Sequence, residues 1–203
     1  FGFSHYLDEF LTPMVGDWSR LVRLVSSPLA ADTLKYAPGP IDPEFECDVA
    51  FVGGHWPYKA KYLNWLVKLK KDLPNLHMKV YGYGNWPLLE YVGPISSENE
   101  VKLLRSAKVV PNLMEPFAIE YGCDLNERSF KTFACNTISI THNTKSVNTM
   151  FGNNIETFSS YNDFKKLIEK YIDVKHTNNN MSEFTKKHNY INRITKLLTE
   201  CYH

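Results

Sequence analysis

The chain has 203 residues, of which 43% are hydrophobic and 22% charged, and its formal net charge is +1. This composition is typical of a globular domain, and it excludes binding to nucleic acid or to an anionic membrane through bulk charge. No apolar run approaches the roughly 20 residues that a membrane span needs, and no signal-peptide pattern opens the sequence. Because the chain starts at Phe1 inside an amphipathic segment, we expect it to be part of a longer protein.

Residues 1–46 form an irregular N-terminal segment. They contain a predicted helix near Tyr6–Leu11 and an apolar stretch at Leu21–Ser26, followed by Pro28, Pro38, Pro40 and Pro43. Proline fixes φ and removes a hydrogen-bond donor, so this passage predicts an extended linker between domains. We therefore treat residues 1–46 as the remnant of an N-terminal domain with its linker, and residues 47–203 as one further domain.

From Asp48 onward, apolar strand-like runs alternate with helical patterns. Strands are predicted at Asp48–Val52, Met78–Tyr81, Lys108–Leu113 and Thr137–Thr141. One helix is predicted after a capping box formed by Ser97 and Glu100. Four others are predicted over Tyr62–Leu69, Asn126–Cys135, Phe164–Ile172 and Phe184–Leu198, and a polar loop is predicted at Asn178–Asn180. This alternation predicts an α/β fold with a Rossmann-like, mostly parallel sheet and helices on both faces.

Four cysteines lie far apart in the sequence, at Cys47, Cys123, Cys135 and Cys201. They form no C-x-x-C pair, which argues against a zinc site and favours a reduced, cytoplasmic compartment. No phosphate loop of the G-x-x-x-x-G-K-[ST] type, nucleophile elbow, H-E-x-x-H or D-x-D motif is present. Carboxylates such as Glu115 and Glu120 are too common in proteins to indicate acid–base catalysis.

Ligands of open parallel sheets bind outside the carboxyl ends of the strands. At that edge the sequence places the turn of Gly53, Gly54 and His55, with Lys59 near the start of the next helix. Glycines allow close backbone approach, and a helix N-terminus beside a cation suits a phosphate. The alternative is a tight turn with a solvated lysine and a packing histidine.

Two further segments lie at the same predicted edge. Tyr81–Trp86 carries two glycines and three aromatic residues, but Pro87 excludes a dinucleotide fingerprint. Its aromatic rings either flank a nucleotide base or pack in the loop. Gly122–Arg128 opens a helix with polar residues and an arginine, which suits a diphosphate clamp. The alternative there is an N-cap by Asp124 or Asn126 with an exposed Arg128.

Five stretches, taken in order, resemble the C-terminal domain of family-4-like glycosyltransferases, in particular the spore-maturation glycosyltransferase-like branch. They are Asp48–Gly54 with Lys59, Val80–Trp86, Tyr91–Pro94, Arg128–Thr137 and His188–Arg193. The resemblance covers roughly Ser26 to Leu198. It implies one half of a GT-B architecture, in which two Rossmann-like domains face each other across a cleft and the C-terminal one binds the nucleotide sugar.

The resemblance also implies the roles of individual residues. Lys59 and Arg128 match basic residues that neutralise the departing diphosphate, where negative charge grows during transfer. We expect the donor to contact a set of residues at the same edge: Gly53, Gly54, Gly82, Tyr83, Gly84, Pro94, Gly122, Asp124, Asn126 and Lys131. The resemblance further implies no catalytic metal and no cofactor besides the nucleoside-diphosphate sugar that serves as donor, and it suggests transfer with retention.

Two residues depart from the family pattern. Lys131 stands where the family has the glutamate expected to hold the nucleotide ribose, and Asn136 replaces the glycine that follows that motif. A lysine cannot accept a hydrogen bond from a ribose hydroxyl. Either the donor is held differently, or Lys131 reaches the phosphate, or this copy is weakened.

The sequence thus predicts the donor-binding part of a glycosyltransferase whose acceptor is a glycan, a protein or a lipid and whose other partner is an N-terminal domain. The alternatives are a non-catalytic nucleotide-sugar-binding module and another GT-B enzyme such as an epimerase.

Overall fold

The computed structural model describes residues 2–88, 90–174 and 181–202. Its main body is a six-stranded sheet in the order β5-β4-β3-β6-β7-β8, and every neighbouring pair is parallel. The strands are β3 (Cys47–Val52), β4 (Met78–Tyr81), β5 (Tyr91–Gly93), β6 (Ala107–Asn112), β7 (Ile138–His142) and β8 (Glu156–Phe158). Central strands that are covered on both faces read as continuous apolar runs, and Val49, Val109 and Ile140 are fully buried.

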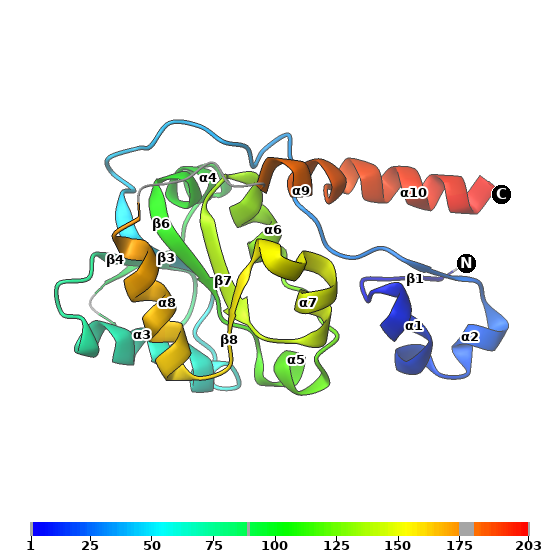
Figure 1. Cartoon of the computed structure of the whole chain (residues 1–203), viewed down its shortest axis with the longest axis horizontal. Coiled ribbons are helices and arrows are strands. Elements are labelled where there is room, and N and C mark those ends of the chain that lie inside the picture. The colour runs from blue at the N-terminus through cyan, green and yellow to red at the C-terminus, as the bar shows by residue number, and fades with distance from the viewer. Residues whose placement is uncertain (1, 89, 175–180, 203) are drawn as a thin grey trace.

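Helices cover both faces of this sheet (Figure 1). On one face lie α3 (Ala60–Asp72) and α8 (Tyr161–Ile172), where Trp65 of α3 packs against Phe158 and Phe164. On the other face lie α4 (Ser97–Ser106), α6 (Glu127–Ala134) and α9 (Met181–Lys187). The predicted α/β fold with a Rossmann-like sheet is confirmed. The remaining elements of the body are α5 (Pro116–Tyr121), α7 (Lys145–Phe151) and the 3-10 helix η1 (Gly152–Asn154).

Residues 2–26 form a small unit at one side of the main body in Figure 1, and Leu7 and Glu9 connect it to that body by core packing and by a hydrogen bond from Thr149. Its parallel strands β1 (Gly2–Ser4) and β2 (Leu24–Ser26) are joined through α1 (Asp8–Val15) and α2 (Trp18–Leu21). The predicted helix at Tyr6–Leu11 thus starts two residues later and runs four residues further.

The proline-rich passage then crosses to the body and is fixed to it. Arg105 Nε donates to the Ala37 carbonyl at 2.7 Å, and the Asp42 amide donates to Ser106 Oγ at 2.8 Å. None of the helices in the described ranges is long and apolar enough to cross a membrane.

The last predicted helix, Phe184–Leu198, is wrong as a single element. Its residues belong to α9 and α10 (Tyr190–Tyr202), and His188 and Asn189 separate the two. The Asn189 amide donates to the carbonyls of Thr185 and Lys186, which ends α9, while its Oδ1 accepts from the Asn192 amide and caps α10.

The predicted capping box is also wrong, because Ser96 rather than Ser97 is the N-cap of α4. Its Oγ accepts from the Asn99 amide at 3.2 Å. Glu100 therefore does not reach back to the helix start, and it accepts a hydrogen bond from Tyr36 of the linker instead, at 2.7 Å. The polar loop predicted at Asn178–Asn180 lies outside the described residues.

Candidate functional site

The strand order reverses between β3 and β6, and we use the term crevice for the carboxyl ends of these two strands with the loops that follow them. From β3 the chain proceeds to β4 and β5 on one side, and it then returns through α4 to β6 on the other side of β3. Connections therefore leave the two neighbouring carboxyl ends in opposite directions, which makes this the topological switch point where open α/β sheets bind ligands. The loops that begin here are Gly53–Lys59 after β3 and Leu113–Glu115 after β6.

Arg128 spans this switch point. Its Nε and one terminal nitrogen donate to the Val52 carbonyl at 3.2 and 2.7 Å, and the other terminal nitrogen donates to Asn112 Oδ1 at 2.9 Å. The guanidinium carbon lies 4.5 Å from the centre of the Phe51 ring. Burial lowers the pKa of Arg128 to about 10, so the group stays charged at neutral pH. The predicted cation is therefore fixed at the ends of both strands.

Lys59 reaches the same crevice from α3. It is the N-cap residue of that helix, and its ammonium forms an ion pair with the carboxylate of Glu115. The exposed fractions of the two side chains are 27% and 19%. Glu115 also acts through space on Arg128, whose charged form it favours. Both predicted cations thus converge on one carboxylate, which the sequence alone did not single out.

The glycines after β3 and β4 allow the two loops to pack directly on each other. A Cβ on Gly82 would lie 2.1 Å from the Gly53 carbonyl oxygen, and one on Gly84 would lie 2.4 Å from the His55 carbonyl oxygen. Both residues also have positive φ, +138° and +89°. The space beside Gly54 is taken by the Trp56 indole, at 2.3 Å from a Cβ placed there. Tyr83, which lies between Gly82 and Gly84 in the chain, is 65% exposed.

The segment Gly122–Asn126 leads into α6, and its residues Asp124, Leu125 and Asn126 line a hollow beside the crevice. Gly122 ends α5 in the left-handed conformation with φ +69°, and Asn126 Oδ1 accepts from the Arg128 amide at 2.8 Å. The predicted N-cap role of Asn126 is thus confirmed, whereas the prediction that Arg128 is exposed is wrong. A pocket of about 420 Å³ contains Glu115, Asp124 and Asn126 together with Glu127. Its wall therefore carries three carboxylates, of which Asp124 also contacts His5 at 3.2 Å.

Three of the highlighted residues lie away from the crevice. Lys131 points along α6 to Glu127 at 3.0 Å and to Glu100 at 3.8 Å, with its ammonium 5.0 Å from the Tyr36 ring. Pro94 is exposed beyond β5, at the outer edge of the sheet.

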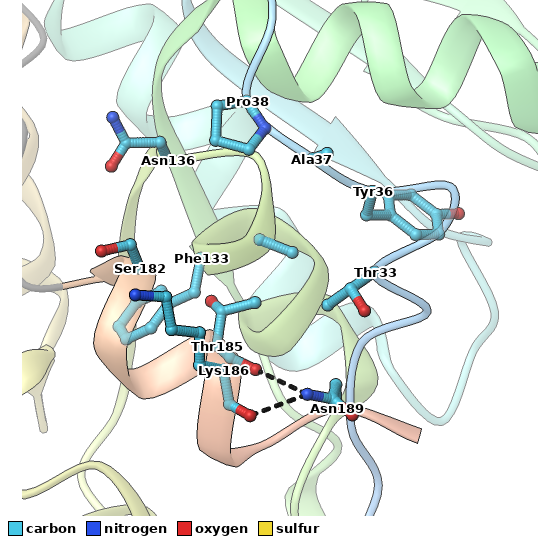
Figure 2. A pocket seen from close by; sticks show the side chains of 11 residues that line it. Thr33, Tyr36, Ala37, Pro38, Phe133, Asn136, Ser182, Thr185, Lys186 and Asn189 are labelled. Carbon is cyan, nitrogen blue, oxygen red and sulfur yellow. Dashed lines mark hydrogen bonds between the residues drawn. The ribbon is translucent and has the colours of Figure 1, made fainter. Parts of the chain in front are cut away.

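Asn136 follows α6 with φ +59°, the left-handed conformation that glycine adopts without strain and asparagine tolerates. It lines a pocket of about 670 Å³ between the linker, the carboxyl end of α6 and α9. Figure 2 shows Pro38, Asn136 and Ser182 around this hollow, with Asn189 bonded to α9 below them.

His142, at the end of β7, is a buried group that the sequence analysis did not identify. Its Nδ1 accepts from the Met114 amide at 3.1 Å, and the ring contacts Tyr62, Trp65 and Phe158. Burial lowers the pKa of His142 to about 4, which keeps it neutral. Among the described residues there is no cluster of three or more histidine, cysteine or acidic side chains that could hold a metal ion.

Comparisons with known proteins agree with this architecture. Residues 46–199 match the model of a family described as glycosyl transferase-like. Among solved structures, the chain is similar to the pneumococcal O-GlcNAc transferase GtfA in complex with UDP and GlcNAc, at 12% identity and TM-score 0.58, covering 96% of this chain and 43% of that one. It is also similar to sucrose-phosphate synthase from Thermosynechococcus elongatus, at 12% identity and TM-score 0.66, covering 96% and 56%.

A third similar structure is AviGT4, a glycosyltransferase involved in avilamycin A biosynthesis, at 12% identity and TM-score 0.59, covering 88% of this chain and 57% of that one. The chain therefore spans about half the length of the solved structures that it matches. No curated protein matches the sequence.

Proposed function

We propose that this chain, which belongs to the glycosyl transferase-like family, is the donor-binding part of a glycosyltransferase. The family match and the fold also confirm the resemblance to GT-B glycosyltransferases. In this proposal residues 47–203 bind a nucleoside-diphosphate sugar. The acceptor, a glycan, a protein or a lipid, approaches across a cleft formed with an N-terminal domain.

The convergence of Lys59 and Arg128 at the switch point carries the proposal. A departing diphosphate gains negative charge during transfer, and fixed positive charge at that position lowers the barrier. Arg128 is fixed by three hydrogen bonds, and Lys59 stands at the start of a 13-residue helix. The partial positive charge of that helix N-terminus adds to the ammonium. In the structure the ammonium of Lys59 is paired with Glu115, and a bound phosphate would replace Glu115 as its partner.

The pocket beside the crevice supports the sugar part of the donor. Its three carboxylates, Glu115, Asp124 and Glu127, accept hydrogen bonds, and sugar hydroxyls donate them. A diphosphate at Lys59 and Arg128 would leave the attached sugar within reach of this pocket. We therefore place the donor's sugar ring there.

We further propose that transfer needs no metal ion, because two protein cations are available to balance the two phosphates. Retention of the anomeric configuration follows from the family resemblance alone. A cytoplasmic location agrees with cysteines that carry thiols and form no disulfide in the described chain.

A non-catalytic nucleotide-sugar-binding module is the second candidate. It is favoured by Lys131, which stands where the family has an acidic residue and forms ion pairs with Glu127 and Glu100. Lys131 itself therefore offers no acceptor for a ribose hydroxyl. The two candidates share the donor site and differ in turnover.

Calorimetry of the chain with UDP, GDP and dTDP and with their sugars tests the proposal. Wild-type protein should bind at least one of them, and Arg128→Ala should lose most of that affinity. Lys71→Ala is the matched control, because Lys71 is an exposed lysine about 18 Å from Lys59 at the other end of α3. A thermal melt of each variant shows that it is folded.

Binding, together with nucleotide release by the full-length protein in the presence of an acceptor, supports a transferase, whereas binding without turnover by the full-length protein supports the module. No binding to any of these nucleotides, or equal affinity in Arg128→Ala, would refute both.

A further inference from the structure

A small pocket next to the proposed phosphate site has no role in the function proposed above. It has a volume of about 350 Å³ and lies where the loops after β3 and β4 meet. Its lining residues are His55, Trp56, Pro57, Gly84 and Asn85. Concave sites of this size bind small ligands through an aromatic wall and a few polar groups.

The walls of this pocket are held in place by backbone contacts. The His55 amide donates to the Tyr83 carbonyl at 2.8 Å, and Gly84 lies against the His55 backbone so closely that a Cβ would not fit. On the other side, the Lys59 amide donates to the Trp56 carbonyl at 2.9 Å and closes a turn with Pro57 at its second position. The pocket is therefore a built feature of the two loops.

Trp56 forms an exposed aromatic wall that the core does not require. Its side chain is 42% exposed, whereas Trp86 of the neighbouring loop is 7% exposed and donates its indole N–H to the Gly53 carbonyl at 3.2 Å. The Trp56 indole lies against Gly54, where any side chain would collide with its Nε1. The missing Cβ at position 54 thus leaves room for this ring position.

The chemistry of the lining selects the kind of ligand. The described residues that line the pocket include no lysine or arginine, so a phosphate would find no ionic partner inside it. An indole face suits a flat apolar surface, while the Asn85 amide and the His55 ring, from two residues that line the pocket, offer donors and acceptors. A hexopyranose ring combines these two properties, with an apolar face of C–H groups and an edge of hydroxyls.

We propose that this pocket binds a hexopyranose ring of the acceptor. The binding of a hexose depends only on the pocket, whereas its assignment to the acceptor rests on the proposed function. Lys59 is close to both pockets, because its amide donates to the Trp56 carbonyl of this one and its ammonium pairs with Glu115 of the carboxylate-lined one. The donor sugar and the acceptor sugar would thus lie on the two sides of the cation that faces the diphosphate.

The experiment is an NMR titration of the ¹⁵N-labelled 203-residue chain that follows the indole N–H signals and the backbone N–H signals of Gly84 and Asn85, which line the pocket and report binding in the variants that lack Trp56. The probes are the methyl pyranosides of glucose, galactose, mannose and N-acetylglucosamine and their short oligomers, then UDP alone, and then UDP-glucose and UDP-N-acetylglucosamine. Trp56→Phe assigns the Trp56 signal. The variants Trp56→Ala and Asn85→Ala remove the wall and one polar group. Tyr58→Ala is the matched control, because Tyr58 is 61% exposed and does not line the pocket.

We expect at least one glycoside to shift the Trp56 signal in the absence of any nucleotide. Trp56→Ala should weaken that binding about tenfold or more, the effect of losing one stacking ring, and Trp56→Phe should recover part of it. Asn85→Ala should weaken binding as well, whereas Tyr58→Ala should leave it unchanged. UDP affinity should be the same in all four variants, so a failure here is separate from a failure of the donor site.

Three outcomes would overturn the proposal. One is the lack of any Trp56 shift with the whole glycoside panel, and a second is an equal loss in Tyr58→Ala. The third is a Trp56 shift that occurs only with UDP-sugars, because the pocket would then hold the sugar of the donor.

Discussion

Replacing Glu115 by glutamine should strengthen the binding of a nucleoside diphosphate. The Glu115 carboxylate neutralises Lys59 and acts on Arg128, so it competes with any phosphate for both cations. Glutamine keeps the size and much of the hydrogen-bonding capacity of the side chain and removes its charge. UDP without a sugar is the ligand of choice, because any contact between Glu115 and sugar hydroxyls is then excluded from the comparison.

The size of the effect follows from the environment of the ion pair. Two unit charges about 4 Å apart interact by about 4 kcal/mol at the effective dielectric constant of a protein surface. The two side chains are 27% and 19% exposed, however, and solvent screening reduces the net interaction free energy of such a pair to about 1 kcal/mol. Removing the competition together with the repulsion of the phosphate should gain about 1–2 kcal/mol, or a roughly 5–30-fold lower Kd.

Calorimetry at two salt concentrations measures this change, and the gain should shrink at higher ionic strength. Glu120→Gln is the matched control, since Glu120 lies exposed on α5 and its substitution removes the same charge. If Glu115→Gln bound UDP no more tightly than the wild type or than Glu120→Gln, Lys59 would not face the phosphate and the site would be misplaced.

Gly82→Ala should lower the free energy of unfolding, measured in urea, by about 3 kcal/mol or more, because its Cβ would meet the Gly53 carbonyl. Gly93→Ala is the control, since Gly93 has φ +120° but open space around it, and it should cost only about 1–2 kcal/mol. Equal losses in the two variants would contradict the packing of the two loops. Burial lowers the pKa of His142 to about 4 from 6.5, so its unfolded form binds more protons between these values, and the free energy of unfolding should fall by up to about 3 kcal/mol as the pH drops from about 7 to 4. His142→Phe should flatten this dependence in urea titrations at several pH values, and an unchanged slope would assign it to other groups. Lys131→Glu should lower the thermal midpoint and cost about 1–2 kcal/mol of stability, because it places a third carboxylate beside Glu100 and Glu127. It should not improve UDP binding. An improved affinity would mean that an acidic residue at this position can reach the ribose.

The sheet could be predicted from the sequence because its inner strands are buried on both faces. Such strands are short apolar runs, and those of β3 and β4 end at glycines, so both were located within one residue. The three-residue strands β5 and β8 and the six-residue helix α5 carry too few residues for a periodic pattern. They form because neighbouring strands and helices complete their hydrogen bonds and cover their apolar side chains.

The partners of the predicted site residues could not be derived from the sequence. Lys59 and Glu115 are 56 residues apart and meet only because β3 and β6 are neighbours at the switch point. The capping residue Asn126 was among the predicted alternatives, because N-cap preferences are local. Whether Arg128 lies exposed or fixed between two strands depends on the packing of α6 on the sheet, which is a property of the whole fold.

The geometry of Arg128 is compatible with one side chain that stabilises the fold and, in the proposed function, also binds the diphosphate. A guanidinium has five N–H groups, and the hydrogen bonds to Val52 and Asn112 account for three of them. The other two N–H groups belong to the two terminal nitrogens, one on each, and in the proposed function they are the donors left for a phosphate. Removing Arg128 should therefore cost stability as well as the proposed binding, because the Val52 carbonyl and the Asn112 side-chain oxygen lose their partner. For this reason neutralising Glu115, which leaves the guanidinium and its three hydrogen bonds in place, separates the electrostatic role of the crevice from its structural role.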